Sequence, residues 1–192
     1  MLKKILVTVT AIGLLSMLGG LAGFAVFTDT ASVGGNTFTT GTILISTTPT
    51  SALVTFSDMA PGDSVQPSAG IVVSNDGTLA LRYAITSTTT EDVLAAALDL
   101  TIREIDVTVP ATPCDDFDGA VIYTTGDLGS TGGIDVVGNP AQGDQGTDRT
   151  LAASATETLC FRVELPLSAT GPEGVTTTAT FAFQAEQTVN NP

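Results

Sequence analysis

Alternation of apolar and polar residues constrains the fold of this chain more than any other sequence feature. A period of two places one set of side chains on the buried face of a β-strand and the other set on its exposed face. The clearest run places Leu79, Leu81, Tyr83 and Ile85 on one face and Ala80, Arg82, Ala84 and Thr86 on the other. Gly, Asp, Asn and Pro, which favour turns, separate such runs.

Segments of this kind predict eight or nine short strands along the chain. The runs cover residues 41–46, 52–57, 71–75, 79–86, 98–102, 105–109, 120–123, 159–165 and 179–187. Strands at this spacing favour an all-β fold, here a jelly-roll-like two-sheet β-sandwich. The apolar phase slips after Arg103, which indicates a β-bulge near residues 103–105. Residues 110–150 are rich in Gly, Asp, Pro and Thr and are predicted to be a long loop region with one strand.

Local signals predict turns and one short helix. Ala60-Pro-Gly-Asp63 predicts a tight turn, and Asn75-Asp-Gly77 predicts a hairpin turn between two paired strands. Thr88 and Glu91 have the spacing of a capping box, which predicts a short helix over residues 92–97.

Residues 1–25 have the composition of a signal peptide. Lys3 and Lys4 precede an apolar run, and Gly23 and Ala25 are the small residues that signal peptidase needs, so cleavage is predicted between Ala25 and Val26. The alternative is an uncleaved anchor, because residues 5–27 are just long enough to span a bilayer. The expected organisation is a signal peptide over 1–25 and one β-sandwich domain over 26–192, secreted to the cell surface or the extracellular space.

Cys114 and Cys160 are the two cysteines of the chain. In an exported protein such a pair favours a disulfide, the alternative being two unpaired thiols. Cys160 falls out of phase with its apolar neighbours Leu159 and Phe161. The disulfide is therefore predicted to fasten a loop to the outside of a sheet.

Charge and composition exclude several functions. The net charge is −14, and after the predicted cleavage four Arg face 20 acidic residues, which gives −16. Such a surface repels nucleic acid and anionic lipid, so we expect no nucleic-acid partner and no membrane contact after cleavage. The chain has no His, which excludes Ser-His-Asp sites and His-ligated zinc. We therefore expect no enzymatic activity, no catalytic or metal-binding residues and no cofactor.

One acidic segment leaves a metal hypothesis open. Cys114-Asp-Asp-Phe-Asp-Gly119 gathers carboxylates in a turn, which suits calcium. The spacing does not match an EF-hand, and Asp and Gly are common in any exposed turn.

Several segments resemble the TasA/camelysin family of secreted proteins. The residues from Ala25 to Ile45 resemble the mature start of these proteins, with an aromatic-polar-Asp step, then Asn-Thr-Phe and Gly-Thr-Ile. Residues 59–63, 73–80 and 179–187 are also similar, whereas 110–150 has no counterpart. The resemblance implies a jelly-roll subunit of extracellular biofilm-matrix fibres. Some family members are described as metallopeptidases, but the absence of His speaks against that activity here.

The resulting hypothesis is a subunit that polymerises head-to-tail by donor-strand exchange. The predicted donor strand is the segment freed by cleavage: Val26, Phe27, Thr28, Asp29, Thr30 and Ala31. Phe27 is a large apolar residue that needs a buried site, and the edge of a neighbouring sheet would provide one. The expected partner is another copy of the chain, with matrix polymers or an accessory fibre protein as further candidates. The alternative is a monomeric surface or matrix protein that binds a partner through the loops of residues 110–150.

Overall fold

The computed structural model describes Lys3, Ile5 and residues 37–53, 57–105, 112–170 and 173–191. The chain divides into two units, residues 1–39 and 40–192, and every strand described here belongs to the second. The predicted signal peptide lies outside the described residues apart from Lys3 and Ile5. Within the described ranges, none of the helices is long and apolar enough to cross a membrane.

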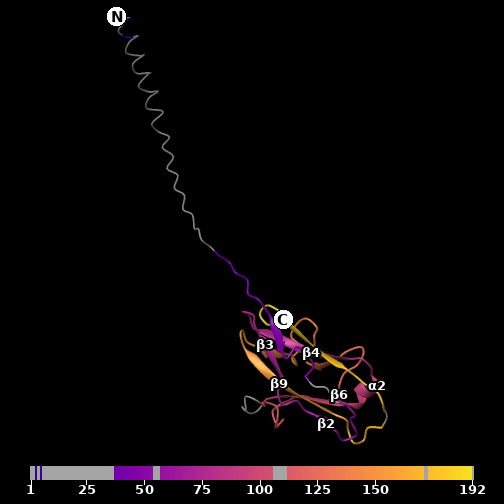
Figure 1. Ribbon diagram of the computed structural model, residues 1–192. Coiled ribbons are helices and arrows are strands. Elements are labelled where there is room, and N and C mark those ends of the chain that lie inside the picture. The colour runs from indigo at the N-terminus through magenta and orange to yellow at the C-terminus, as the bar shows by residue number, and fades with distance from the viewer. Residues whose placement is uncertain are drawn as a thin grey trace. The chain divides into compact units, whose positions relative to one another are not determined.

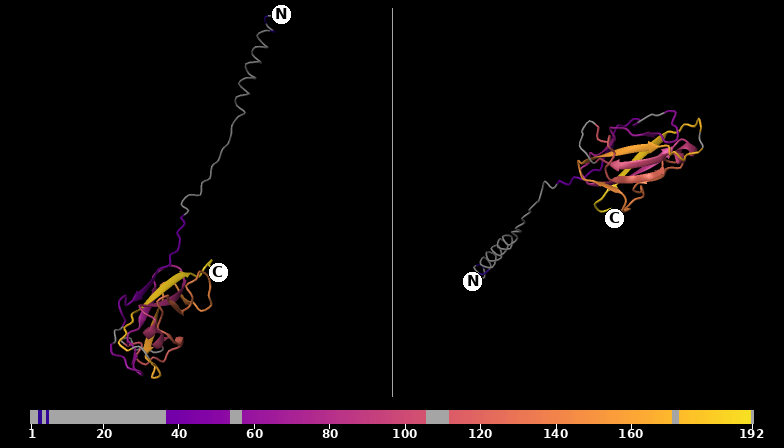
Figure 2. Two further views of the ribbon diagram at one scale, coloured as in Figure 1. Left: turned by 90° about the vertical axis from the view of Figure 1, so that its right-hand side faces the viewer. Right: turned by 90° about the horizontal axis from the view of Figure 1, so that it is seen from below.

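The second unit consists of two antiparallel β-sheets that face each other (Figures 1 and 2). Sheet A contains, in order, β1 (Ile45–Thr48), β3 (Ile71–Asn75), β9 (Thr156–Glu164), β5 (Asp99–Glu104) and β6 (Val121–Asp127), and β2 (Ser64–Val65) also pairs with β9. Sheet B contains β10 (Ala179–Gln187), β4 (Leu81–Thr89) and β7 (Ile134–Val137), and β8 (Arg149–Leu151) also pairs with β4. One short helix, α2 (Val93–Ala97), connects β4 to β5. The predicted all-β two-sheet sandwich with one short helix is confirmed.

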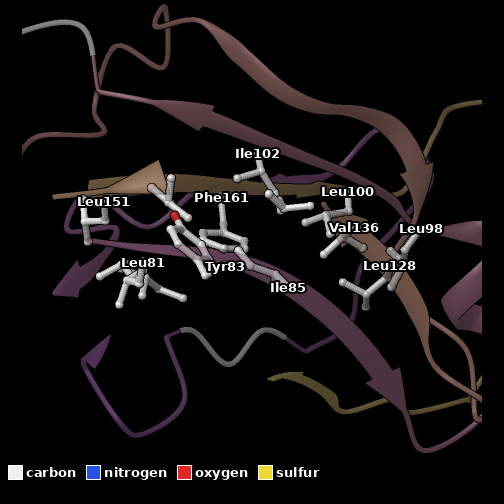
Figure 3. Packing of buried hydrophobic residues seen from close by; sticks show 14 of the residues in the cluster. Leu81, Tyr83, Ile85, Leu98, Leu100, Ile102, Leu128, Val136, Leu151 and Phe161 are labelled. Atoms are coloured by element: carbon white, nitrogen blue, oxygen red, sulfur yellow. The ribbon is translucent and has the colours of Figure 1, made fainter. Parts of the chain in front are cut away.

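The hydrophobic core fills the space between the two sheets (Figure 3). Its fully buried members include Leu81, Tyr83 and Ile85 of β4, Leu100 and Ile102 of β5, and Leu159 of β9. These are the inward positions of the alternating runs seen in the sequence. Each buried Leu or Ile stabilises the fold by about 1.5–3 kcal/mol relative to an exposed side chain.

The turn after β3 differs from the predicted hairpin, because it carries the chain from sheet A to sheet B. Asn75 is 1% exposed, and its side chain organises this crossing. Its Nδ2 donates to the carbonyl oxygens of Leu79 at 2.8 Å, Leu151 at 3.2 Å and Ala152 at 3.0 Å. The Asn75 amide group thus satisfies carbonyl groups at a place where three chain segments meet. The hairpin prediction was wrong because one of these segments, at residues 151–152, is distant in sequence from the turn.

Residues 110–150 hold more regular structure than predicted. Besides loops, they contain β6, β7 and β8, of which only the start of β6 was expected. The pairing of β5 with β6 shifts register between Ile102 and Arg103, one residue before the predicted bulge. Ile105 is outside any strand, and residues 106–109 of the predicted strand lie outside the described residues.

Two predicted N-terminal strands also differ from the structure. The segment 41–46 becomes a strand only from Ile45 onward. Within the predicted strand 52–57, residues 52, 53 and 57 are not in a strand, and the rest lies outside the described residues.

The helix is present where predicted, but its cap is different. Thr88 is part of β4, and Asp92 is the N-cap residue. The Glu91 carboxylate accepts hydrogen bonds from the backbone N–H groups of Val93 at 2.8 Å and Leu94 at 3.0 Å. A carboxylate at this position satisfies donors that the first helical turn leaves free.

The sandwich has two distinct ends. At the first, called the terminal end, the Thr78 N–H donates to the Thr42 oxygen at 2.9 Å, and the Thr188 N–H donates to the Ala80 oxygen at 3.2 Å. At the second, called the helix end, the Leu128 N–H donates to the Ala95 oxygen of α2 at 3.1 Å, the Thr90 N–H donates to the Thr178 oxygen at 3.1 Å, and the Gly62 N–H donates to the Leu165 oxygen at 2.7 Å. Figure 1 shows the C-terminus beside the first end and α2 beside the second.

Candidate functional site

The residues predicted to form the donor strand, Val26–Ala31, lie outside the described residues. The same holds for the predicted cleavage site between Ala25 and Val26. Both stay predictions, and a strand of this kind could bind at a sheet edge of the described domain.

The chain that leads into β1 presents apolar side chains to solvent. Phe38 is 95% exposed and Leu44 is 57% exposed. The segment is anchored at Thr42, whose N–H donates to the Thr78 hydroxyl at 2.9 Å. Gly41 allows this close approach, because a Cβ there would lie 2.5 Å from the Leu79 side chain. The sequence thus fixes where the N-terminal chain joins the sandwich.

Strand β10 has one pairing partner among the described residues. It pairs with β4 over nine residues, from Ala179 opposite Thr89 to Gln187 opposite Leu81, and no described strand pairs with its other side. A free strand side presents N–H and C=O groups to any chain that can pair with them.

The inward side chains of β10 are only half-buried, although they pack on the core. The Phe181 ring lies 5.1 Å from the Phe161 ring, and the Phe183 ring lies 6.2 Å from the Tyr83 ring. Phe161 and Tyr83 are almost completely buried, whereas both β10 aromatics keep some exposure. An additional strand beside β10 could cover this aromatic surface and pair with the backbone at once.

The predicted disulfide is present between Cys114 and Cys160, which lie 46 residues apart. It forms a small buried cluster with Phe117, separate from the main core. Arg103 and Arg162 lie over the Phe117 ring, at 5.3 and 4.7 Å from its centre. The prediction that the disulfide fastens a loop to the outside of the sheet is therefore confirmed.

An ion network that links the two sheets was not predicted from the sequence. Arg149 of sheet B binds two carboxylates of sheet A, Glu157 with its Nε at 3.0 Å and Glu104 with its Nη2 at 2.7 Å. The Tyr83 hydroxyl donates to Glu157 at 2.6 Å. Burial raises the pKa of Tyr83 well above its ordinary value, and the hydrogen bond to Glu157 raises it further. The sequence held one signal of a buried charge, because Glu157 lies two residues before Leu159 and therefore on the same inward face of β9.

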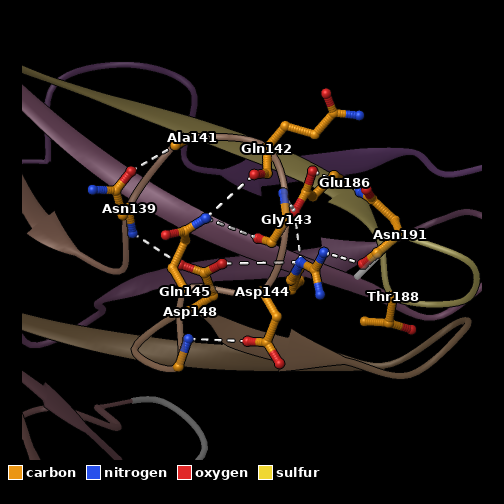
Figure 4. Close-up of polar contacts among 12 residues, drawn as sticks. Asn139, Ala141, Gln142, Gly143, Asp144, Gln145, Asp148, Glu186, Thr188 and Asn191 are labelled. Atoms are coloured by element: carbon orange, nitrogen blue, oxygen red, sulfur yellow. Dashed lines mark hydrogen bonds and ion pairs between the residues drawn. The ribbon is translucent and has the colours of Figure 1, made fainter.

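A second network fastens a loop to the outer face of sheet B (Figure 4). Arg82 is 5% exposed, and its Nε pairs with Glu186 at 2.5 Å and lies 4.0 Å from Asp148. Glu186 also accepts from the Gly143 N–H at 3.0 Å, and Asp148 accepts from the Asn139 N–H at 2.8 Å. The loop between β7 and β8 is therefore held by buried charge, again through contacts distant in sequence.

The described residues do not provide a metal centre. Across the ranges that the structure covers, no group of three His, Cys, Asp or Glu side chains could hold a metal ion. Asp115, Asp116 and Asp118, the residues of the calcium hypothesis, are exposed and form no such group. Both cysteines are engaged in the disulfide.

Comparison with protein families identifies a match. A family model described as camelysin metallo-endopeptidase matches residues 1–104, more than half of the 192-residue chain. The matched range runs from the N-terminus through β5 and includes most segments that carried the predicted resemblance. The search of curated proteins gave no match.

Proposed function

The chain belongs to the camelysin metallo-endopeptidase family, and from this premise we propose that it is a secreted structural subunit of extracellular, biofilm-matrix filaments. Its partner is another copy of itself, and the subunits join head-to-tail by donor-strand exchange. The observation that carries this proposal is the side of β10 with which no described strand pairs, beside half-buried Phe181 and Phe183.

In the proposed contact, residues Val26–Ala31 of one copy extend along β10 of the next copy. Backbone hydrogen bonds between the two strands give affinity, and apolar side chains of the donor give specificity. Val26 or Phe27 would cover the exposed parts of Phe181 and Phe183. Covering one large aromatic or aliphatic side chain contributes about 1.5–3 kcal/mol.

This contact propagates because donor and acceptor are different surfaces. Each copy gives its N-terminal segment to one neighbour and receives another segment along β10. A heterologous contact that does not close generates a filament. Before signal cleavage the donor has no free end, so export and processing would control when assembly begins.

Metallo-endopeptidase activity, the activity in the family description, has no supporting residues in the described part of the chain. The whole chain lacks His, and the described carboxylates form no three-ligand group. The residues present therefore do not fit a His-ligated zinc.

The alternative of a monomer that binds partners through residues 110–150 has less support. The loop after β7 is fastened through Arg82, and the loop before β6 is fastened by the disulfide. Loops that are fixed to the domain in this way have little freedom to change conformation when a partner binds.

Electron microscopy and sedimentation of the protein that begins at Val26 test the proposal. We expect filaments with a regular repeat from the intact protein and folded monomers after deletion of Val26–Thr30. Replacing the same five residues by Gly and Ser keeps the length and serves as the matched control, and it should also abolish assembly. Normal filaments from the deleted protein would show that the donor-strand mechanism is wrong.

Two point variants distinguish the loss of a buried apolar side chain in the donor strand from the effect of an added negative charge. Phe27→Asp should prevent assembly, whereas Thr28→Asp adds the same charge on the opposite side of an extended strand and should have a smaller effect. Equal effects of the two variants would argue against insertion of Phe27 into the neighbour.

A further inference from the structure

The exposed large apolar side chains of the sandwich domain gather at its two ends. Ile43, Leu44 and Val189 lie at the terminal end, and Val93, Leu167 and Val175 lie at the helix end. Ile105 and Val121 are the remaining exposed members among the described residues of this unit. Scattered single apolar residues need no explanation, but sets at opposite ends of one domain do.

Leu167 is the most prominent of these residues, since it is 81% exposed on a well-fixed loop. The Ala169 N–H donates to the Pro166 oxygen at 2.8 Å, which closes a turn around Leu167. The loop is tied down at Leu165, whose N–H donates to the Asp63 oxygen at 2.9 Å and whose oxygen accepts from Gly62 at 2.7 Å. The loop backbone that carries the exposed Leu167 side chain is therefore already ordered. A contact between Leu167 and another molecule would lose little further conformational entropy of the loop.

The opposite surface is also fixed by backbone hydrogen bonds. The Leu44 oxygen accepts from the Asp76 N–H at 2.8 Å, which holds Ile43 and Leu44 against the turn after β3. Val189 follows Thr188, which is bound to Ala80 on the far side of the same turn. The three apolar residues thus flank one short segment, residues 76–80.

We propose that the Leu167 loop of one copy packs against Ile43, Leu44 and Val189 of the next copy. This contact rests on the proposed function and adds a second surface to the donor-strand contact. The two surfaces lie at opposite ends of the same domain, so a contact between them repeats along a row of subunits without closing.

The position of the N-terminal chain indicates that a second copy is the occupant. The chain joins the sandwich at Thr42, within the terminal end. Residues 32–41, which connect the predicted donor strand to this point, span at most about 35 Å when fully extended. A copy that holds the donor strand is therefore kept close to the terminal end, which raises the effective concentration of its Leu167 loop there.

Photo-crosslinking of assembled filaments tests the contact directly. A benzophenone amino acid replaces Leu167, and in a matched control it replaces Val121, which is exposed but far from both ends. We expect crosslinks from position 167 to peptides that contain residues 42–45 or 187–190 of another copy, and none to these peptides from position 121. Crosslinks from position 167 to any other part of a neighbouring copy overturn the proposal.

Point variants give an independent measurement. Leu167→Asp should raise the critical concentration for assembly at least about tenfold, the loss expected for one well-buried Leu, and Ser168→Asp should change it much less. Because Leu167 is exposed, both variants should keep the melting temperature of the monomer. If Leu167→Asp assembles like the wild type, the end-to-end contact is wrong while donor-strand exchange stands. If the intact protein forms no filaments, both proposals fail.

Discussion

The Tyr83 hydroxyl donates a 2.6 Å hydrogen bond to Glu157, and this bond joins the two sheets inside the sandwich. Burial and this bond raise the pKa of Tyr83 above its ordinary value. A raised pKa in the folded state contributes stability below the unfolded-state pKa of about 10, and that contribution is lost as the pH rises beyond it. We therefore expect the free energy of unfolding, measured in urea, to fall steeply above pH 10.

The variant Tyr83→Phe should separate this effect from other alkaline changes. At pH 7 it should cost about 1 kcal/mol, because Glu157 loses one hydrogen bond but keeps Arg149. Above pH 10 its stability should fall less than that of the wild type. A slope should remain, since burial also raises the pKa of Tyr123. An unchanged alkaline slope in the variant would contradict the assignment to Tyr83.

Arg149→Leu should destabilise the domain more than Arg162→Leu does. It leaves the largely buried Glu157 and the 43%-exposed Glu104 without their shared cation, and we expect a loss of roughly 2 kcal/mol in the free energy of unfolding, because solvent screens part of the cost of the unpaired charges. Arg162→Leu is the control, because it removes a cation that lies over the Phe117 ring and outside the Glu157–Glu104 network. It should cost about 1 kcal/mol or less. Similar losses for both variants would mean that the network is not an inter-sheet clamp.

Removal of the disulfide should lower stability without changing the fold. The loop-entropy model gives about 4 kcal/mol for a loop of this length. Because Cys114 and Cys160 lie outside the main core, Cys114→Ser/Cys160→Ser should keep the circular dichroism spectrum of a β-sandwich. Chymotrypsin should then cut at Phe117, a site protected in the oxidised protein. Loss of the whole β-sheet signal would show that the disulfide is needed by the core itself.

Zinc and chelators should leave the stability of the domain unchanged. A metal that binds only the folded state raises the melting temperature, and a chelator reverses the effect. Since the described residues contain no three-ligand group, zinc or EDTA should shift the melting temperature by no more than the scatter between repeats. A saturable increase with zinc, reversed by EDTA, would reopen the peptidase activity of the family description.

The alternating runs were sufficient to predict the core strands, and β3 was predicted residue for residue. In β4, β9 and β10 one face packs on the core while the other is more polar, so local periodicity carries the assignment. β7 and β8 were missed because each has only three or four residues in a Gly-rich region, too few to establish a period. Their position is set by pairing with β4 instead.

The parts of the site that could not be predicted depend on contacts distant in sequence. Arg149 and Glu104 are 45 residues apart, and Arg82 and Glu186 are 104 residues apart, so no local pattern pairs them. The Asn75 turn shows the same limit. Asn75-Asp-Gly77 is a good hairpin signal, and only the long-range contacts of the buried Asn75 side chain show that the chain crosses to the other sheet. By contrast, the phase of Cys160 was local information, and it correctly placed the disulfide outside the core.

The nine-residue pairing of β10 with β4 has a mechanical consequence. If a donor strand lies along β10, tension on a filament enters each domain parallel to its strands. The load then shears all the hydrogen bonds of the β10 ladder together, instead of opening them one after another from an end. A row of such subunits would stretch little until many bonds fail at once, so the strand contact along β10, and not the covalent chain, would set the strength of the filament.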